Sequence, residues 1–455
     1  MPPVHKINVV AAAVLIFFWL QSPAQNLQNL SLDNAVVLAR EKKPALRRYS
    51  VEEKINTARL AETRLQRGLK LSVGADARVN PFLPTSVIPV GQFNLQNPTD
   101  ETRSIRFGTW WQAGAGLTAG ISLIDPSLSA RLREQEFESR LTANNRQEAE
   151  TNVTSEVVRA YYALLLADEE IRFLESDLKR ATTFLTDAEQ RQAGGAALPA
   201  DVNSAQIQVN DAQLRIEQAR ENRRLARENL VFRMGLPAES VTGLTLGETL
   251  EGALRKTIAD TNDQFDPVAA GQNRPDIRRL VLDDQLQNLK MESEKARLKP
   301  TLNASAYLGL DNLSDDIPLF AKDSWFANGN VALRLNIPLS ERWELKKRML
   351  PLSLKQEQNA AQLDDLRQQL RYTFETARSA YALAQRQLPI RQNDIALASA
   401  NLELARAGYS GGNGLASAIT DGEATLQQKQ YAWLQTAYNL LVAELEMRLA
   451  RGEVR

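Results

Sequence analysis

The chain has 455 residues, its 55 Lys and Arg balance 55 Asp and Glu, and it contains one His and no Cys. Without cysteine there is no disulfide framework, no thiolate nucleophile and no Cys-ligated zinc. The single histidine, His5, lies in a segment that we expect to be removed, so the mature chain lacks the commonest general base. Zero net charge gives no general attraction to nucleic acid. These features argue against an enzyme, a metal or cofactor site and a nucleic-acid partner.

The amino-terminal residues 1–24 are typical of a secretory signal peptide. Lys6 supplies the positive start, Val9 to Leu20 is an unbroken apolar run, and Ser22-Pro23-Ala24 supplies small residues for cleavage. The apolar run is too short for a bilayer core of about 30 Å, so a membrane anchor is the less favoured alternative. The negative mean hydropathy excludes a polytopic helical membrane protein but not a β-barrel, whose strands are only half apolar.

The rest of the sequence contains two similar halves. Pro44-Ala45-Leu46-Arg47-Arg48 has a counterpart in Pro275-Asp276-Ile277-Arg278-Arg279, and each segment opens a polar, helix-forming stretch that leads into strand-like sequence. Asp201 and Asp421 occupy equivalent places near the end of each half. A repeat with so long a period is not a solenoid. We therefore predict two structural repeats that arose from a duplicated half.

Each half ends in two long helices joined by a glycine-rich turn. The predicted ranges are 127–193 and 199–234 in the first half, and 341–407 and 415–450 in the second. The longest would measure on the order of 100 Å, and such a helix needs a coiled-coil partner along its whole extent. Apolar residues recur at steps of three, four or seven, and we interpret these stripes as helix-to-helix packing.

Four segments alternate between apolar and polar residues, which is the pattern of a half-buried strand. They begin near Leu71, Leu117, Thr301 and Val331. The polar face carries Asp76, Arg78 and Arg334, candidates for a wet barrel lumen, and the apolar face would meet lipid. A sheet covered by helices is the alternative. Aromatic residues near the strand ends are typical of a membrane–water interface; they are Phe82, Trp110, Trp111, Phe320, Trp325 and Phe326.

Four strands cannot close a barrel, and open strand edges cannot face lipid. The strands of one barrel must therefore come from several copies of the chain, and the pattern alone does not choose between eight and twelve strands. The predicted organisation is a signal peptide, then helices, a strand hairpin and a long helix pair, an equatorial linker, and a second helix, hairpin and helix pair. The corresponding ranges are 1–24, 25–69, 70–124, 125–237, 238–274, 275–299, 300–340 and 341–455.

Several motifs, weak singly and specific in combination, resemble the TolC-like outer membrane efflux protein family over essentially the whole mature chain. The family's turn between long helices appears as Arg191, Gly195 and Asp201-Val202. The second turn departs from it in two ways. Gly408 stands where the first turn has arginine, and Gly412 lies nine positions before Asp421, whereas Gly195 lies six positions before Asp201. Other matching segments are Ala160-Tyr161-Tyr162, Gly235-Leu236-Pro237, Leu123-Ile124-Asp125-Pro126 and Pro338-Leu339-Ser340.

The resemblance implies a mixed fold and a homotrimer. A twelve-stranded barrel in the outer membrane, with four strands from each chain, would continue into a long α-helical coiled-coil tunnel through the periplasm. The helix tips would dock a periplasmic adaptor protein and an inner-membrane pump, and the chain itself would be a passive exit duct. A duct of a type I protein-secretion system is one alternative, and a periplasmic coiled-coil scaffold or adaptor is another from a different class.

The resemblance also places Asp421 near the narrow periplasmic entrance, where three copies would form a carboxylate ring that attracts cations. Glu423 would either reinforce this ring or face solvent. For Asp421 the alternative is a solvated acid near a helix start. The candidate tip and adaptor contacts are Arg191, Gly195, Asp201, Tyr409 and Gly412. For Asp201 the favoured alternative is a helix cap, because it follows Pro199 at the start of a helix.

Overall fold

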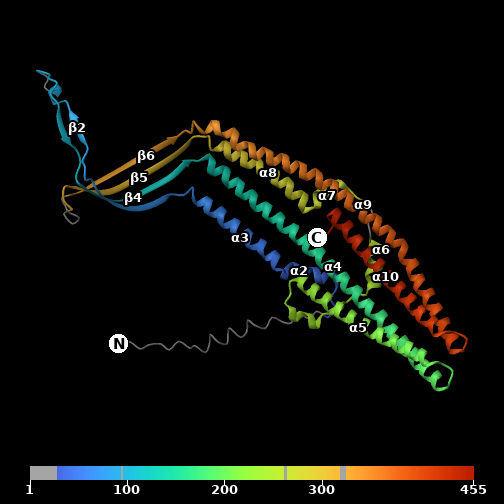
Figure 1. The fold of residues 1–455 in the computed structure, drawn as a ribbon. Coiled ribbons are helices and arrows are strands. Elements are labelled where there is room, and N and C mark those ends of the chain that lie inside the picture. Colours follow the sequence, from blue (N-terminus) through green and yellow to red (C-terminus); the bar gives the residue numbers. More distant parts are fainter. Residues whose placement is uncertain (1–27, 94–95, 261–263, 318–323, 455) are drawn as a thin grey trace, which may run out of the picture. The chain divides into compact units, whose positions relative to one another are not determined.

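The computed structural model describes residues 28–93, 96–260, 264–317 and 324–454, and the expected signal peptide lies outside them. The chain forms two compact units (Figure 1). The helical unit contains Leu141–Leu282 and Asn359–Arg455 together with the residues up to Glu52. The strand unit contains Glu53–Arg140 and Asp283–Gln358.

The helical unit is built on two long antiparallel helix pairs. Their helices are α4 (Pro126–Ala193) with α5 (Pro199–Met234), and α9 (Glu341–Ser410) with α10 (Ala416–Arg451), where α4 and α9 begin in the strand unit. The four long helices predicted from the sequence are thus confirmed, with α9 reaching three residues further than expected. The shorter elements are α2 (Leu32–Lys42), η2 (Ala238–Gly243), α6 (Leu250–Asp260), α7 (Pro267–Asn273) and α8 (Pro275–Ala296), the last running into the strand unit.

The helix ends follow local sequence rules. The Ser31 side chain caps α2 by accepting a hydrogen bond from the Asn34 N–H at 3.3 Å. Helices α5 and α10 both end at a glycine in the left-handed conformation, Gly235 and Gly452, whose N–H groups satisfy carbonyl oxygens of the last turn. The segment 238–274, expected to be a linker, contains η2, α6 and α7, and Leu250, Ala253 and Leu254 of α6 are buried.

The largest apolar core joins α4, α9 and α10 to the short helices α2 and α6. Tyr161, Phe374 and Leu440 are fully buried within it. The Tyr161 hydroxyl donates to the carbonyl oxygen of Leu30 at 3.0 Å, which ties the start of the described chain to α4. A separate apolar seam between α4 and α5 contains Ile171, Leu174, Ile216 and Ala219. The stripes interpreted as helix packing therefore pack helix against helix.

The strand unit contains an antiparallel sheet with the strand order β1-β4-β5-β6. The strands are β1 (Lys70–Val79), β4 (Trp111–Ile124), β5 (Thr301–Ser314) and β6 (Trp325–Asn336). Helix α3 (Pro44–Leu65) leads into β1, and a small hairpin of β2 (Thr85–Ile88) and β3 (Arg103–Arg106), with the short η1 (Val90–Phe93), lies between β1 and β4. Within the described chain β1 and β6 are each paired on one side only.

The register of the sheet puts the polar residues of all four strands on one face. Asp76 lies opposite Gly114, which in turn lies opposite Asp311, and Asn303 lies opposite Arg334. The neighbouring positions form an apolar face whose exposed side chains include Leu71, Val73, Leu117, Leu308, Leu310, Val331, Leu333 and Leu335. The alternation predicted from the sequence is confirmed in all four strands.

Strands β4 and β6 begin earlier than the sequence pattern indicated. The run from Ala113 to Gly116 alternates only between alanine and glycine, so it carries no visible contrast in polarity, yet it is fully paired with β1 and β5. Trp111 and Trp325, expected near loop ends, are the first residues of β4 and β6. Phe320, another of the expected interface aromatics, lies outside the described residues.

Two glycines on the polar face make room for one aromatic ring. A Cβ atom at Gly309 would lie 2.3 Å from the Tyr307 hydroxyl oxygen, and one at Gly116 would lie 2.5 Å from it. The ring of Tyr307 therefore lies across these two glycines. Gly120, on the same face, has open space around the position of a Cβ atom.

We predict that Gly309→Ala displaces the Tyr307 ring and lowers the stability of the folded protein by about 1–3 kcal/mol, the usual effect of overpacking. Gly120→Ala is the matched control, because its methyl group meets no atom. Thermal unfolding of the detergent-solubilised variants, followed by circular dichroism, measures the difference. Equal midpoints for the two variants would contradict the role given to Tyr307.

Candidate functional site

The turns at the ends of the two long helix pairs form the tip of the helical unit (Figure 1). Each turn reverses through a glycine with positive φ, 74° at Gly195 and 83° at Gly412, and both glycines are exposed. The longer second turn closes on Gly408, whose carbonyl oxygen accepts hydrogen bonds from Asn413 at 3.0 Å and Gly414 at 2.9 Å. The additional residues of this turn are thus wound into a compact loop.

Arg191 links the two turns to each other. Its Nη1 donates to the carbonyl oxygen of Ser410 at 2.6 Å, and its guanidinium group lies 4.8 Å from the centre of the Tyr409 ring. Tyr409 is buried and meets the Phe184 ring edge-to-face at 5.4 Å. Two of the predicted tip residues, Arg191 and Tyr409, therefore contact each other within one chain.

Tyr409 is part of a small apolar core that holds the tip together. Phe184, Leu402, Ile419 and Leu426 belong to the same cluster. Burial raises the pKa of the Tyr409 hydroxyl, and the nearby Asp201 carboxylate raises it further. In the part of the chain that the structure describes, this hydroxyl has no hydrogen-bond partner. The ring therefore contributes packing, and its contact with Arg191 fixes one turn against the other.

Asp201 caps the start of α5. Its Oδ2 accepts a hydrogen bond from the N–H of Leu198 at 3.1 Å, at the turn that precedes the helix. The side chain is partly exposed, so a contact with a partner at this place stays a prediction. The capping role is the alternative that the sequence analysis had kept open, and the structure shows that hydrogen bond directly.

Glu423 lies inside the helical unit, bound by two arginines from other helices. Its carboxylate accepts three hydrogen bonds of 3.2 Å from Arg180 of α4 and one of 2.8 Å from Arg406 of α9. Its side chain is 10% exposed. The expectation that Glu423 might simply face solvent is therefore corrected. The acid is held by the three helices α4, α9 and α10, because it lies on the buried face of α10.

The same cluster includes a second buried acid, Asp177 of α4, which is paired with Arg180. Burial raises the pKa of the Asp177 carboxyl, and the positive charge of Arg180 opposes this rise. Burial alone would lower the pKa of Arg180, but its hydrogen bonds to Glu423 and the charge of that acid raise it. A buried ion pair of this kind stabilises little by its presence, but losing one partner leaves a charge without compensation.

Asp421 lies on the opposite side of α10 from Glu423, since two residues turn a helix by about 200°. Its side chain is exposed, and it has no ion-pair partner among the described residues. The two acids of the expected entrance ring are thus separated by the fold. Asp421 presents an exposed carboxylate at the surface of the chain, and Glu423 is neutralised by Arg180 and Arg406.

Arg180, Arg406 and Asp177 were not predicted from the sequence, although they form an ion-pair cluster with Glu423 near the tip. Their positions carry no local motif, because an arginine on a long polar helix is usually a solvated side chain. The one signal was their spacing: Asp177 and Arg180 are three residues apart and so share a face of α4 with buried Ala181. Only the packing of α4 against α9 and α10 brings the charges together.

In the strand unit, the three predicted lumen residues are all exposed on the polar face of the sheet. Asp76 and Arg78 are on β1, and Arg334 is on β6. Asp311 of β5 lies on the same face as Asp76, and both carboxylates lean over Gly114, which stands between them in the sheet. A Cβ atom at Gly114 would lie 3.3 Å from the Asp76 Oδ1 and 3.1 Å from the Asp311 Oδ1. Asp311 accepts a hydrogen bond from Asn328 of β6.

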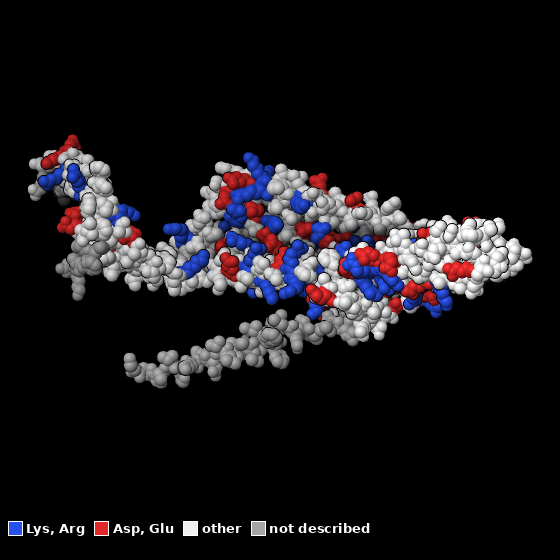
Figure 2. All heavy atoms as spheres, turned by 60° about the horizontal axis from the view of Figure 1, so that its bottom comes forward, with Lys and Arg blue, Asp and Glu red and all other residues white. Residues whose placement is uncertain are grey.

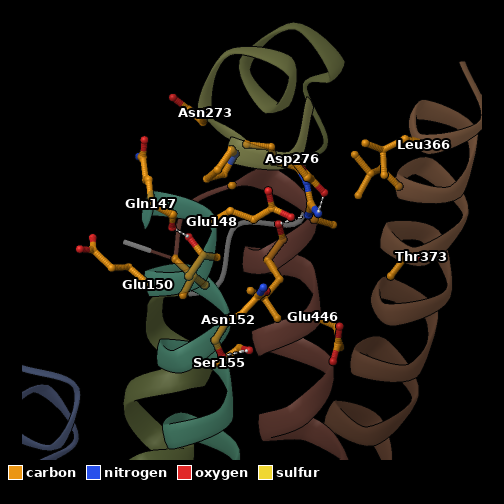
Figure 3. A pocket seen from close by; sticks show the side chains of 18 of the residues that line it. Gln147, Glu148, Glu150, Asn152, Ser155, Asn273, Asp276, Leu366, Thr373 and Glu446 are labelled. Carbon is orange, nitrogen blue, oxygen red and sulfur yellow. Dashed lines mark hydrogen bonds and ion pairs between the residues drawn. The ribbon is translucent and has the colours of Figure 1, made fainter. Parts of the chain in front are cut away.

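A polar pocket of about 480 Å³ lies in the helical unit among α4, α9, α10 and the turn before α8 (Figure 3). Its charged residues are paired with one another or with neighbours. Arg159 bonds to Glu446, and the Arg274 Nε donates to Asp276 at 2.9 Å. Glu148 pairs with Arg279 at 3.1 Å. Arg40, which also lines the pocket, donates to the Thr154 hydroxyl at 3.1 Å, so most of the pocket's charged groups already have a partner.

Over the described residues, no group of three or more His, Asp or Glu side chains is placed to hold a metal ion. Within the same part of the chain, no helix combines the length and apolar character required to cross a membrane. Figure 2 shows basic and acidic side chains intermingled over the face drawn, while the outermost part of the tip carries few charges.

Comparison with known proteins gives a family for part of the chain and a fold for nearly all of it. Residues 90–236 match the model of the outer membrane efflux protein family. No curated protein sequence matches the chain.

Three solved structures illustrate the similarity of fold. The outer membrane protein VceC of Vibrio cholerae has a TM-score of 0.68 and 15% identity, covering 92% of this chain and 96% of its own. The CmeC outer membrane channel of Campylobacter jejuni has a TM-score of 0.68 and 15% identity, and the match covers 92% of this chain and 85% of CmeC. The open state of the MtrE outer membrane channel of Neisseria gonorrhoeae has a TM-score of 0.67 and 17% identity, and the match covers 92% of this chain and 88% of MtrE.

Residues 90–236 thus match the outer membrane efflux protein family, and nearly the whole chain shares the fold of these outer-membrane channels, in agreement with the resemblance of its motifs to the TolC-like family.

We predict that Glu423→Gln destabilises the folded protein by roughly 3 kcal/mol, because it leaves the buried positive charges of Arg180 and Arg406 without their shared carboxylate. Asp421→Asn is the control two residues away, and as an exposed substitution it should change stability by about 0.5 kcal/mol or less. Denaturant unfolding of the two variants measures both effects. A Glu423→Gln protein as stable as Asp421→Asn would show that the cluster does not stabilise the tip.

Proposed function

We propose that three copies of this chain form the outer-membrane exit duct of a tripartite efflux system. The observation that carries this proposal is the sheet, which has one polar face, one apolar face and two edges that no other described strand pairs with. Three such sheets joined edge to edge give a closed barrel of about twelve strands. The apolar face would then meet lipid, and the polar face with Asp76, Arg78 and Arg334 would line a wet lumen.

The helical unit would continue this path as a tunnel. The element order helix, strands and long helix pair occurs once from α3 to α5 and again from α8 to α10, which supports the two predicted repeats. The duct does no chemical work, so the energy for transport would come from an inner-membrane pump. The polar walls would let varied solutes pass without binding.

The tip is the part of the chain that we assign to a periplasmic adaptor. Gly195 and Gly412 are exposed and small, and Arg191 is the charged side chain that lies beside Gly412, so a partner can approach the backbone of both turns closely. Arg191 holds the turns side by side, so they would be presented as one rigid surface. Shape and backbone contacts, more than charge, would therefore determine docking at this surface.

We predict that protein extracted from outer membranes in detergent has a protein mass three times that of the processed chain. Sedimentation or light scattering with correction for detergent gives this mass. A water-soluble monomer or dimer that is absent from the membrane fraction would contradict the channel assembly and favour a periplasmic scaffold.

We also predict that Asp421 sets the ion preference of the duct. Three exposed carboxylates in a constriction concentrate cations, so Asp421→Asn should lower the cation-over-anion permeability ratio several-fold in planar bilayers. Glu217→Gln is the control, because Glu217 is an exposed acid on α5 whose side chain is 68% exposed. Unchanged selectivity in Asp421→Asn would remove Asp421 from the entrance.

A further inference from the structure

A small cavity of about 100 Å³ lies behind the tip, between the helices α4, α5 and α10. On α5 it is lined by Gln208, Asp211, Ala212 and Arg215. These residues follow one another at steps of three, four and seven, so they share one face of the helix. The lining residues of α10 are those that stand 212 positions later in the sequence. The two helices therefore present equivalent faces to the cavity.

A hydrogen bond between α5 and α10 closes the cavity at each end. The Gln208 Nε2 donates to the Thr420 Oγ1 at 2.5 Å, and Arg215 donates to the Gln427 Oε1. Both helices run away from the tip, so these two bonds lie about two helical turns apart. Between them the facing residues include two alanines, whose small side chains leave the space open.

Two oxygen atoms of the cavity wall lack a hydrogen-bond donor. Asp177 of α4 is 2% exposed, Arg180 binds its Oδ1, and Gln427 also bonds to its carboxyl group. Within the described part of the chain, the Asp177 Oδ2 has no partner, and neither has the Gln208 Oε1, whose amide is oriented by the bond to Thr420. Buried acceptors without a donor are rare and costly. These two atoms therefore indicate a ligand that both would contact.

The charges around the cavity indicate that this ligand is a cation. The lining contains three acids and one base. The base, Arg215, is bound to Gln427, and the acid Glu423 is held by one arginine of α4 and one of α9. Asp211 is exposed and forms no ion pair with the other described residues. Oxygen atoms of carboxylates and amides are the ligands that hard divalent cations such as Ca²⁺ and Mg²⁺ prefer.

We propose that this cavity binds a hydrated divalent cation, which joins the α4–α5 helix pair to α10 behind the tip. The Asp177 Oδ2, the Gln208 Oε1 and the Asp211 carboxylate supply the protein ligands, and water molecules supply the others. Two carboxylates with retained waters are a usual arrangement for Mg²⁺, and Ca²⁺ also accepts waters. A cavity of this volume holds an ion and several waters. The inference goes beyond the proposed duct, because all three protein ligands belong to one chain.

Calcium binding to the detergent-solubilised protein tests the site. The Asp421→Asn protein is the parent for this test, since it lacks the exposed acid assigned to the entrance ring. After treatment with a chelator, equilibrium dialysis against labelled Ca²⁺ should show saturable binding of one ion per chain. The unfolding midpoint should also be a few degrees higher with Ca²⁺ than with chelator, because a ligand of the folded state stabilises that state.

Two variants of this parent remove the site in different ways. Asp211→Asn deletes a ligand at an exposed position, and Ala424→Val fills the cavity from an exposed position while keeping every ligand. Each should weaken Ca²⁺ binding at least about tenfold, since even outer-shell changes at metal sites alter affinity by about 10–100-fold. Their unfolding midpoints in chelator should match the parent, which shows that both are folded. Glu217→Gln is the matched control, an exposed acid of α5 outside the cavity lining, and should bind Ca²⁺ like the parent.

The outcomes separate this site from the entrance ring and from the duct. Lack of saturable binding, or binding that Asp211→Asn and Ala424→Val leave unchanged, would overturn the site. Binding that the natural chain shows and the Asp421→Asn parent loses would assign the cation to Asp421 and also overturn the site. A protein that is monomeric by mass should still bind Ca²⁺, so failure of the proposed assembly and failure of the site are distinguishable.

Discussion

The four-stranded sheet sets the constraint on which the rest of this structure depends. Its register gives one polar face and one apolar face, and among the strands that the structure describes, the outer strands β1 and β6 are each paired on one side only. Exposing a large aliphatic side chain to water forfeits about 1.5–3 kcal/mol of burial, and an unpaired edge in lipid costs several kcal/mol for each polar group. A single chain can neither cover the apolar face of this sheet nor pair its two edges. The sheet is therefore suited to an assembly within a membrane.

The long helices meet the same constraint in a different way. Within a protomer, α4 and α10 are covered on both sides, whereas α5 and α9 keep a second apolar face. A helix that is apolar on two opposite sides needs two partners. The strand edges and these helix faces thus both indicate a partner outside the chain. The strand edges need backbone hydrogen bonds from that partner, and the helix faces need side-chain packing.

At the tip, polar and apolar contacts hold the two turns and the helices behind them together within one chain. The ring of Tyr409 and the apolar cluster around it hold the two turns together, and the Arg191 bond to Ser410 fixes their alignment. The Glu423 cluster binds three helices just behind the tip. The exposed Asp421 is not part of this cluster.

The sequence by itself determined the long helices, the alternating strands and the two glycine turns, because each depends on local periodicity or on the conformational freedom of glycine. It also singled out Asp421, Arg191 and Tyr409. Only the tertiary structure decided that Glu423 is bound by Arg180 and Arg406 and that Arg191 lies against Tyr409. These contacts join residues more than two hundred positions apart or on different helices, and local patterns do not encode which helix faces another. The exposed apolar faces of α5 and α9 were likewise visible only once the covered faces were known.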